Sequence, residues 1–229
     1  MDLYWKRFSE FWAPRFEQVQ YFLYLLGCVL FSFGANFFIA SHLGTDPLDV
    51  MALGLIQHVP WMTVGMAHGG FAALCLGVWA IWNRKAPPLS PFVTFFLCGS
   101  LIDLWMHIQV ANAFLFLPPF PMMLIGVVLC AYGSSLIIMS GIGIRAMDLV
   151  AISMVNKWRL PFWASKGALE VLLLVSGWIL GGPIGIGTLF FLAFVGWLIQ
   201  PLMWANNQFL KLRNYGLEVS QSGPTSQLT

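Results

Sequence analysis

The chain contains one stretch of sequence twice. Residues 27–52 read GCVLFSFGANFFIASHLGTDPLDVMA, and residues 126–151 read GVVLCAYGSSLIIMSGIGIRAMDLVA. The two stretches align without a gap, and nine of the 26 aligned positions are identical. Besides aliphatic residues, the identities include three glycine pairs and one aspartate pair: Gly27 with Gly126, Gly34 with Gly133, Gly44 with Gly143, and Asp49 with Asp148. An apolar composition explains matching aliphatic residues but not matching glycines and acids, so we infer two related units.

The composition is that of a membrane protein. Of the 229 residues, 59% are hydrophobic and only 9% are charged, whereas a soluble domain carries about 25% charged residues. Long apolar stretches recur along the whole chain, and no polar block is large enough for a separate extramembrane domain. A single all-α membrane domain is therefore expected.

Six apolar segments are long enough to cross a bilayer, which takes about 20 helical residues. They are 21–41, 62–82, 91–108, 118–140, 162–180 and 184–205. Two further apolar segments, 45–58 and 145–158, would form helices only roughly 21 Å long, so we expect them to be re-entrant or interfacial helices. The predicted fold has six transmembrane helices and two short ones.

The positive charges select this count of spans, because cytoplasmic loops collect Lys and Arg. With six spans and a cytoplasmic N-terminus, all eleven Lys and Arg residues fall on the cytoplasmic side. Treating the two short segments as spans would move Arg84, Lys85 and Arg145 outside. We therefore predict a multi-pass protein of a bacterial plasma membrane with both termini in the cytoplasm.

The predicted parts of the chain are an interfacial amphipathic helix at 1–20, the first repeat at 21–110, the second repeat at 111–208, and a polar cytoplasmic tail at 209–229 that is expected to be disordered. Each repeat has three spans, an odd number, so the second must enter the membrane from the opposite side. Such inverted repeats are frequent in secondary transporters, where interrupted helices of both halves meet near the midplane. They also occur in channels and membrane enzymes.

Ionisable residues inside a membrane are costly, and each is a functional candidate. Asp46 can cap the helix that follows, Pro47 suits its first position, and Asp49 suits its third. Capping alone could therefore explain Asp49. Asp148 keeps the acid where Arg145 stands three residues earlier, so it could pair with that arginine. Alternatively, both acids bind a cation, relay protons or receive a substrate amine.

The predicted fifth span carries a second charged group. Lys166 and Glu170 are one helical turn apart and can neutralise each other. Gly65 and Gly69 stand near the equivalent positions of the first repeat and form a G-x-x-x-G motif, which usually serves helix packing. His68 in the same stretch is expected to be a packing residue with a hydrogen bond. The candidates for a substrate or ion pathway are Gly44, Thr45, Asp46, Asp49, His68, Gly143, Arg145, Asp148, Lys166 and Glu170.

Other classes of protein lack support. The four cysteines, Cys28, Cys75, Cys98 and Cys130, lie in apolar stretches without metal-site spacing. We therefore expect them to be packing residues, and we expect no metal or cofactor. No P-loop, dinucleotide-binding glycine pattern or hydrolase motif is present, so we expect no enzyme and no catalytic residue. Asp103 is expected to face the headgroups. The basic residues follow the cytoplasmic rim and do not indicate nucleic-acid binding.

Four segments resemble the YczE/YyaS/YitT-type family of bacterial membrane proteins. They are LGTDPLDVMALGL at 43–55, VGMAHGG at 64–70, GSLID at 99–103 and GIGTLFFLAFVG at 185–196. The resemblance implies a small polytopic plasma-membrane protein whose activity is generally unassigned. The second repeat departs from the pattern at Arg145, where the first has Asp46.

Two functions remain open from the sequence. The preferred hypothesis is a transporter-like protein that moves a small solute or ion by rearranging the two inverted units. The alternative is an accessory protein that does not transport but stabilises or localises a partner complex. Besides the lipid bilayer, the expected partners are the solute or ion and either a second copy of the chain or a partner protein.

Overall fold

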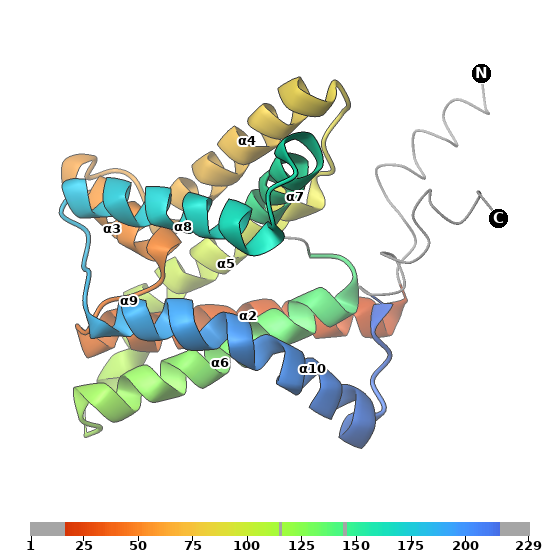
Figure 1. The fold of residues 1–229 in the computed structure, drawn as a ribbon. Coiled ribbons are helices and arrows are strands. Elements are labelled where there is room, and N and C mark those ends of the chain that lie inside the picture. Colours follow the sequence, from red (N-terminus) through yellow and green to blue (C-terminus); the bar gives the residue numbers. More distant parts are fainter. Residues whose placement is uncertain (1–16, 115, 144–145, 216–229) are drawn as a thin grey trace.

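Helices make up every regular element of the described residues, and no strand is present among them. The structure is a computed structural model that describes residues 17–114, 116–143 and 146–215 (Figure 1). The all-α prediction is confirmed. The predicted interfacial helix at 1–20 and the predicted tail at 209–229 lie largely outside the described residues, which begin at residue 17 and end at residue 215.

The helices follow the predicted segments closely. In chain order they are α2 (Gln18–Ser41), α3 (Pro47–His58), α4 (Val64–Asn83), α5 (Ser90–His107), the 3-10 helix η1 (Val110–Phe114), α6 (Pro119–Ser140), α7 (Ala146–Trp158), α8 (Phe162–Ile179), α9 (Ile186–Phe190), the π-helix η2 (Phe191–Val195) and α10 (Gly196–Leu210). The last three form one continuous helical stretch from Ile186 to Leu210.

Four helical stretches of the described chain are long and apolar enough to cross a membrane. They are Gln18–Ser41, Val64–Asn83, Pro119–Ser140 and Ile186–Leu210. The helices α5 and α8 have 18 residues each, which gives a length of about 27 Å. The chain is therefore an all-helical protein with four candidate membrane spans.

The helices α2 and α6 cross in opposite directions and make the most extensive contact between the two halves (Figure 1). Four glycines lie at this crossing. A Cβ atom on Gly27 would lie 2.8 Å from the carbonyl oxygen of Gly133, and one on Gly126 would lie 3.0 Å from that of Gly34. Gly27 thus contacts Gly133, and their repeat counterparts Gly126 and Gly34 contact each other in the same way. The absence of side chains allows the two backbones to approach closely.

Both helices end in the same way at equivalent positions. The Ser41 hydroxyl donates to the Phe38 carbonyl at 2.7 Å, and the Ser140 hydroxyl donates to the Ile137 carbonyl at 2.6 Å. The next residue is left-handed in both cases, with φ of 54° at His42 and 71° at Gly141. A left-handed residue ends a helix by turning the chain away from its axis. Here it directs the chain toward α3 and toward α7.

Each short helix packs on a long helix of the other half. α3 packs against α8, and α7 packs against α4. The first contact is close, because a Cβ on Gly54 of α3 would lie 2.9 Å from the carbonyl oxygen of Gly177 in α8. The second contact is made by small and aliphatic side chains, including Ala72 and Ala146. The short helices lie toward opposite ends of the bundle (Figure 1).

The two halves differ in the contact between their second and third long helices. In the first half α4 packs tightly on α5, where a Cβ on Gly99 would lie 2.7 Å from the Cα of Gly65. This confirms packing for the first glycine of the G-x-x-x-G motif. In the second half the described residues of α8 and α10 are not packed closely. A Cβ on Gly196, the counterpart of Gly99, would meet open space.

Asp103 on α5 reinforces the tight contact. Its two carboxylate oxygens accept the backbone N–H groups of Val64 and Gly65, both at 2.8 Å. These groups belong to the first turn of α4, where N–H groups have no partner within the helix. Asp103 therefore caps a neighbouring helix, a role that the sequence analysis did not predict.

The glycine crossing yields a first prediction. Gly133→Ala places a methyl group against the backbone of α2 and should destabilise the fold by about 1–3 kcal/mol through overpacking. In detergent, the unfolding temperature should fall by several degrees. Gly77→Ala on α4 is the matched control, since a Cβ there meets open space and alanine favours a helix. Equal unfolding temperatures of the two variants would contradict the close contact of Gly133 with the backbone of α2.

Candidate functional site

A cavity of about 970 Å³ lies between the two halves. The first turns of both short helices line it, together with residues of α2, α4, α5, α6, α8, η2 and α10. Five of the residues on its wall are ionisable: Asp46, His68, Asp148, Lys166 and Glu170. Segments distant in the sequence thus bring most of the predicted charged candidates together at one site.

The start of α3 is built by helix capping. The side chain of Asp46 accepts the backbone N–H of Asp49 at 2.8 Å, and Pro47 occupies the first turn. A carboxylate at a helix N-terminus is stabilised both by this bond and by the helix dipole. The predicted capping role of Asp46 is confirmed, while its side chain also borders the cavity.

Asp49 forms a buried pair with His68 that the sequence analysis missed. The Oδ1 atom of Asp49 lies 2.9 Å from the Nε2 atom of His68, and the residues are 0% and 1% exposed. The hydroxyl of Thr45 donates to the other carboxylate oxygen at 3.3 Å. Capping therefore does not account for Asp49, since its carboxylate is held by two other side chains. The expected hydrogen bond of His68 is confirmed, with an acid as partner.

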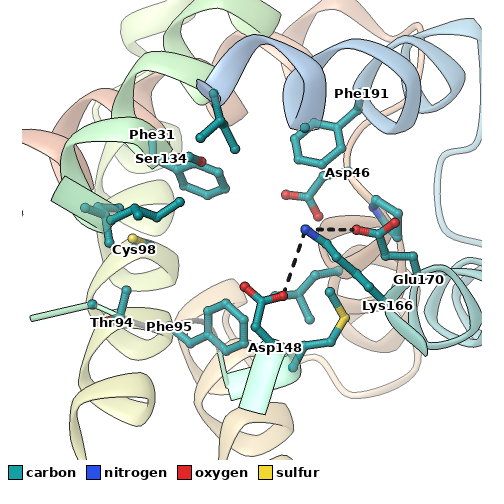
Figure 2. Close-up of a pocket in the computed structure, with 18 of the residues that line it drawn as sticks. Phe31, Asp46, Thr94, Phe95, Cys98, Ser134, Asp148, Lys166, Glu170 and Phe191 are labelled. Atoms are coloured by element: carbon teal, nitrogen blue, oxygen red, sulfur yellow. Dashed lines mark ion pairs between the residues drawn. The ribbon is translucent and has the colours of Figure 1, made fainter. Parts of the chain in front are cut away.

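The second half has a looser charged group. The Nζ atom of Lys166 lies 3.9 Å from Oδ1 of Asp148 and 3.9 Å from Oε1 of Glu170 (Figure 2). The predicted pair within α8 is therefore present. The other prediction paired Asp148 with Arg145, which lies outside the described residues; the partner that the structure gives Asp148 is Lys166 on the next long helix.

The two acid–base pairs follow one rule. In each half, the duplicated acid at the third position of the short helix contacts a basic residue on the long helix that comes next. Asp49 reaches His68 on α4, and Asp148 reaches Lys166 on α8. Lys166 aligns near Gly65 in the repeat, so the two bases do not occupy equivalent positions. A search for an acid and a base on consecutive helices would have found both pairs, but the repeat alignment alone could not.

The two repeated loop glycines have different surroundings. Gly143 lines the cavity. Gly44 has a φ of 103°, and a Cβ on it would lie 2.6 Å from the backbone nitrogen of Gly185, just before α9. Close by, the Gly187 N–H donates to the Leu43 carbonyl at 2.7 Å. At Leu43 and Gly44 the end of α2 therefore contacts the start of α9. Gly44 does not border the cavity.

Aromatic and small polar side chains complete the wall. Phe31, Phe95 and Phe191 come from three separate helices and surround the charged group (Figure 2). Sequence analysis did not single them out, because phenylalanines are common throughout the chain. Cys98 also borders the cavity, and all four cysteines are buried and form no disulfide. The described residues contain no group of three or more metal-ligating side chains.

The buried pair yields a second prediction. His68→Ala leaves the fully buried Asp49 carboxylate without its main partner, which should cost on the order of 3 kcal/mol. For a chain of this size the unfolding temperature should fall by roughly 10 °C. His107→Ala, which removes an exposed histidine, is the control. Adding Asp49→Asn to His68→Ala should recover part of the lost stability. If the stability losses of the two single variants simply add in the double variant, the pair is contradicted.

Comparisons with known proteins agree with this architecture. A family of unknown function, DUF6198, matches residues 18–203. The protein YyaS of Bacillus subtilis is 29% identical over 81% of this chain and 92% of its own length. The membrane protein YczE of the same organism is 27% identical over 85% and 88%, respectively. A protein of Haemophilus influenzae is 21% identical over 84% and 86%.

All three relatives are described as uncharacterised, so they extend the family without assigning an activity. No solved structure matches the chain significantly. The family match covers most of the sequence, including all the ionisable residues of the cavity wall. The chain therefore belongs to the DUF6198 family and is of the YczE/YyaS type of bacterial membrane proteins.

Proposed function

We propose that this protein is a transporter of a small solute, which binds in the cavity between two inverted halves and crosses when the packing of the halves changes. The observation that carries the proposal is the convergence of the first turns of α3 and α7 on one cavity of about 970 Å³. In inverted-repeat transporters the substrate binds near the midplane, where interrupted helices of both halves meet. Small-molecule sites generally have volumes of about 300–1,000 Å³.

The contacts of the two halves support the inverted relation. A twofold axis through the crossing of α2 and α6 exchanges Gly27 with Gly126 and Gly34 with Gly133, which matches the observed glycine contacts. The same axis exchanges α3 with α7 and α4 with α8. It therefore relates the α3–α8 contact to the α7–α4 contact. Six spans follow if α5 and α8 cross the membrane like their counterparts α10 and α4.

The difference between the halves indicates which side of the cavity is open. α4 and α5 are closed on each other, whereas the space between α8 and α10 belongs to the cavity. The cavity reaches Asn207 and Asn214 near the end of α10. Lys211 and Arg213 lie beside this end, and positive charges favour the cytoplasmic side. In the proposed cycle this state is open to the cytoplasm, and the opposite state closes α8 on α10 and separates α4 from α5.

Transport is tested directly in liposomes. Purified full-length protein is reconstituted, and uptake of radiolabelled cations, anions, zwitterions and neutral solutes is measured. We expect saturable uptake of at least one class that depends on the protein. Gly196→Phe should abolish this uptake, because the added ring projects into the cavity from a position with no atom in its way.

The control is Gly77→Phe, since Gly77 also faces open space but does not border the cavity. This variant should transport like the unmodified protein, and both variants should keep its unfolding temperature. Uptake that survives Gly196→Phe would remove the cavity from the pathway. If no solute is taken up and a stoichiometric partner protein copurifies from native membranes, the accessory role replaces transport.

A further inference from the structure

Two residues on the wall of the cavity have buried polar atoms that lack hydrogen-bond partners. Among the described residues, a few buried side-chain polar atoms have no hydrogen-bond partner. Two of them belong to residues that line the cavity, namely Nδ1 of His68 and Oδ1 of Asp148. Buried polar atoms are normally satisfied, and an exception calls for a water, an ion or a ligand. The type of missing group thus indicates what the cavity binds.

His68 carries the first of these atoms. Its Nε2 atom lies 2.9 Å from a carboxylate oxygen of Asp49. An ionised carboxylate can only accept, so Nε2 is the donor of this bond. The Nδ1 atom is left without a partner. Because the residue is only 1% exposed, bulk water does not supply one.

Asp148 carries the second unpartnered atom, Oδ1, and a carboxylate oxygen is an acceptor. Lys166 is its ion-pair partner, but the distance of 3.9 Å exceeds the roughly 2.7–2.9 Å of a charge-assisted hydrogen bond. The same holds for the 3.9 Å between Lys166 and Glu170. The lysine therefore neutralises the site by proximity without donating to either acid. Figure 2 shows its ammonium group between them, at the end of a flexible chain that reaches into the cavity.

The remaining wall suits a cation with an apolar body. Phe31, Phe95 and Phe191 lie around the charged group (Figure 2), and aromatic faces attract ammonium groups. The N-termini of α3 and α7 would favour an anion by themselves. Each of these ends already carries a carboxylate in its first turn, Asp46 in the cap of α3 and Asp148 in α7.

We propose that the cavity binds a small organic ammonium, a protonated amine on an apolar body, and that Lys166 is a tethered cation which the ligand displaces from Asp148. The ligand would bring the N–H donor that Oδ1 of Asp148 lacks. This assignment rests on the proposed function in that it names the substrate class of the same cavity. Lys166 then sets the affinity by competing with the solute for one carboxylate.

Binding to the purified full-length protein in detergent tests this separately from transport. Four probes share a benzyl or phenyl group and differ in charge and donors: benzylammonium, benzyltrimethylammonium, benzyl alcohol and benzoate. A ligand that binds the folded state raises the unfolding temperature. We expect benzylammonium to do so most strongly, benzyltrimethylammonium less because it has no N–H group, and the other two not at all.

Two variants decide between a cationic and an anionic ligand. Asp148→Asn should weaken benzylammonium binding by roughly tenfold or more, since a close charge partner is lost. Lys166→Gln should strengthen it by roughly three- to tenfold, because the competing charge is removed. Lys157→Gln on α7, which does not border the cavity, should change nothing.

The opposite pattern overturns the assignment. Binding of benzoate that is lost in Lys166→Gln would make the site anionic, and failure of benzylammonium to bind the unmodified protein would exclude the ammonium class. A further outcome is that benzylammonium binds with the expected response of the variants while no solute enters the liposomes. That result would support the cation site and contradict transport. Uptake of a solute of another class without benzylammonium binding would keep transport and overturn the assignment.

Discussion

The glycine contact between α2 and α6 is the constraint on which the other features depend. Side chains at Gly27, Gly34, Gly126 or Gly133 would meet the opposite backbone or side chains within about 3 Å, so only glycine allows this approach. The crossing fixes α2 and α6 in opposite directions and therefore places their ends at opposite ends of the bundle (Figure 1). The identical turns after Ser41 and Ser140 then lead into short helices whose first turns reach the same cavity.

Two differences between the sequence repeats supply charged side chains of the cavity wall. Gly65 and Gly69 keep α4 close to α5, whereas Lys166 and Glu170 stand near the equivalent positions of α8. Charged side chains of this length cannot be placed where Gly65 meets Gly99. In the proposed cycle these residues keep α8 away from α10, and they line the cavity between the two helices. Closing that space requires Lys166 to leave it.

Local patterns predicted a large part of this structure. Apolar length predicted most helix bounds within about two residues, although α2 begins at Gln18 and α10 ends at Leu210, and the Thr45 to Asp49 stretch predicted the start of α3 with its Asp46 cap. The contact of Asp49 with His68 was missed because capping explained one residue and packing the other, and nothing local joins them. The role of Asp103 was missed for the same reason, since its partners lie on another helix. Side chains that meet only after folding have no signature in the spacing of one sequence.

The central claim is that Lys166 and Glu170 hold α8 away from α10 and that the two halves move reciprocally. Spin labels on exposed positions measure this: Ala168 and Phe209 for the α8–α10 pair, Met66 and Leu104 for the α4–α5 pair. Distances are recorded by electron paramagnetic resonance in lipid nanodiscs, with and without the double substitution Lys166→Gly and Glu170→Gly. The account predicts that the substitution shortens the α8–α10 distance and lengthens the α4–α5 distance. Unchanged distances, or a change of both in the same direction, would contradict it.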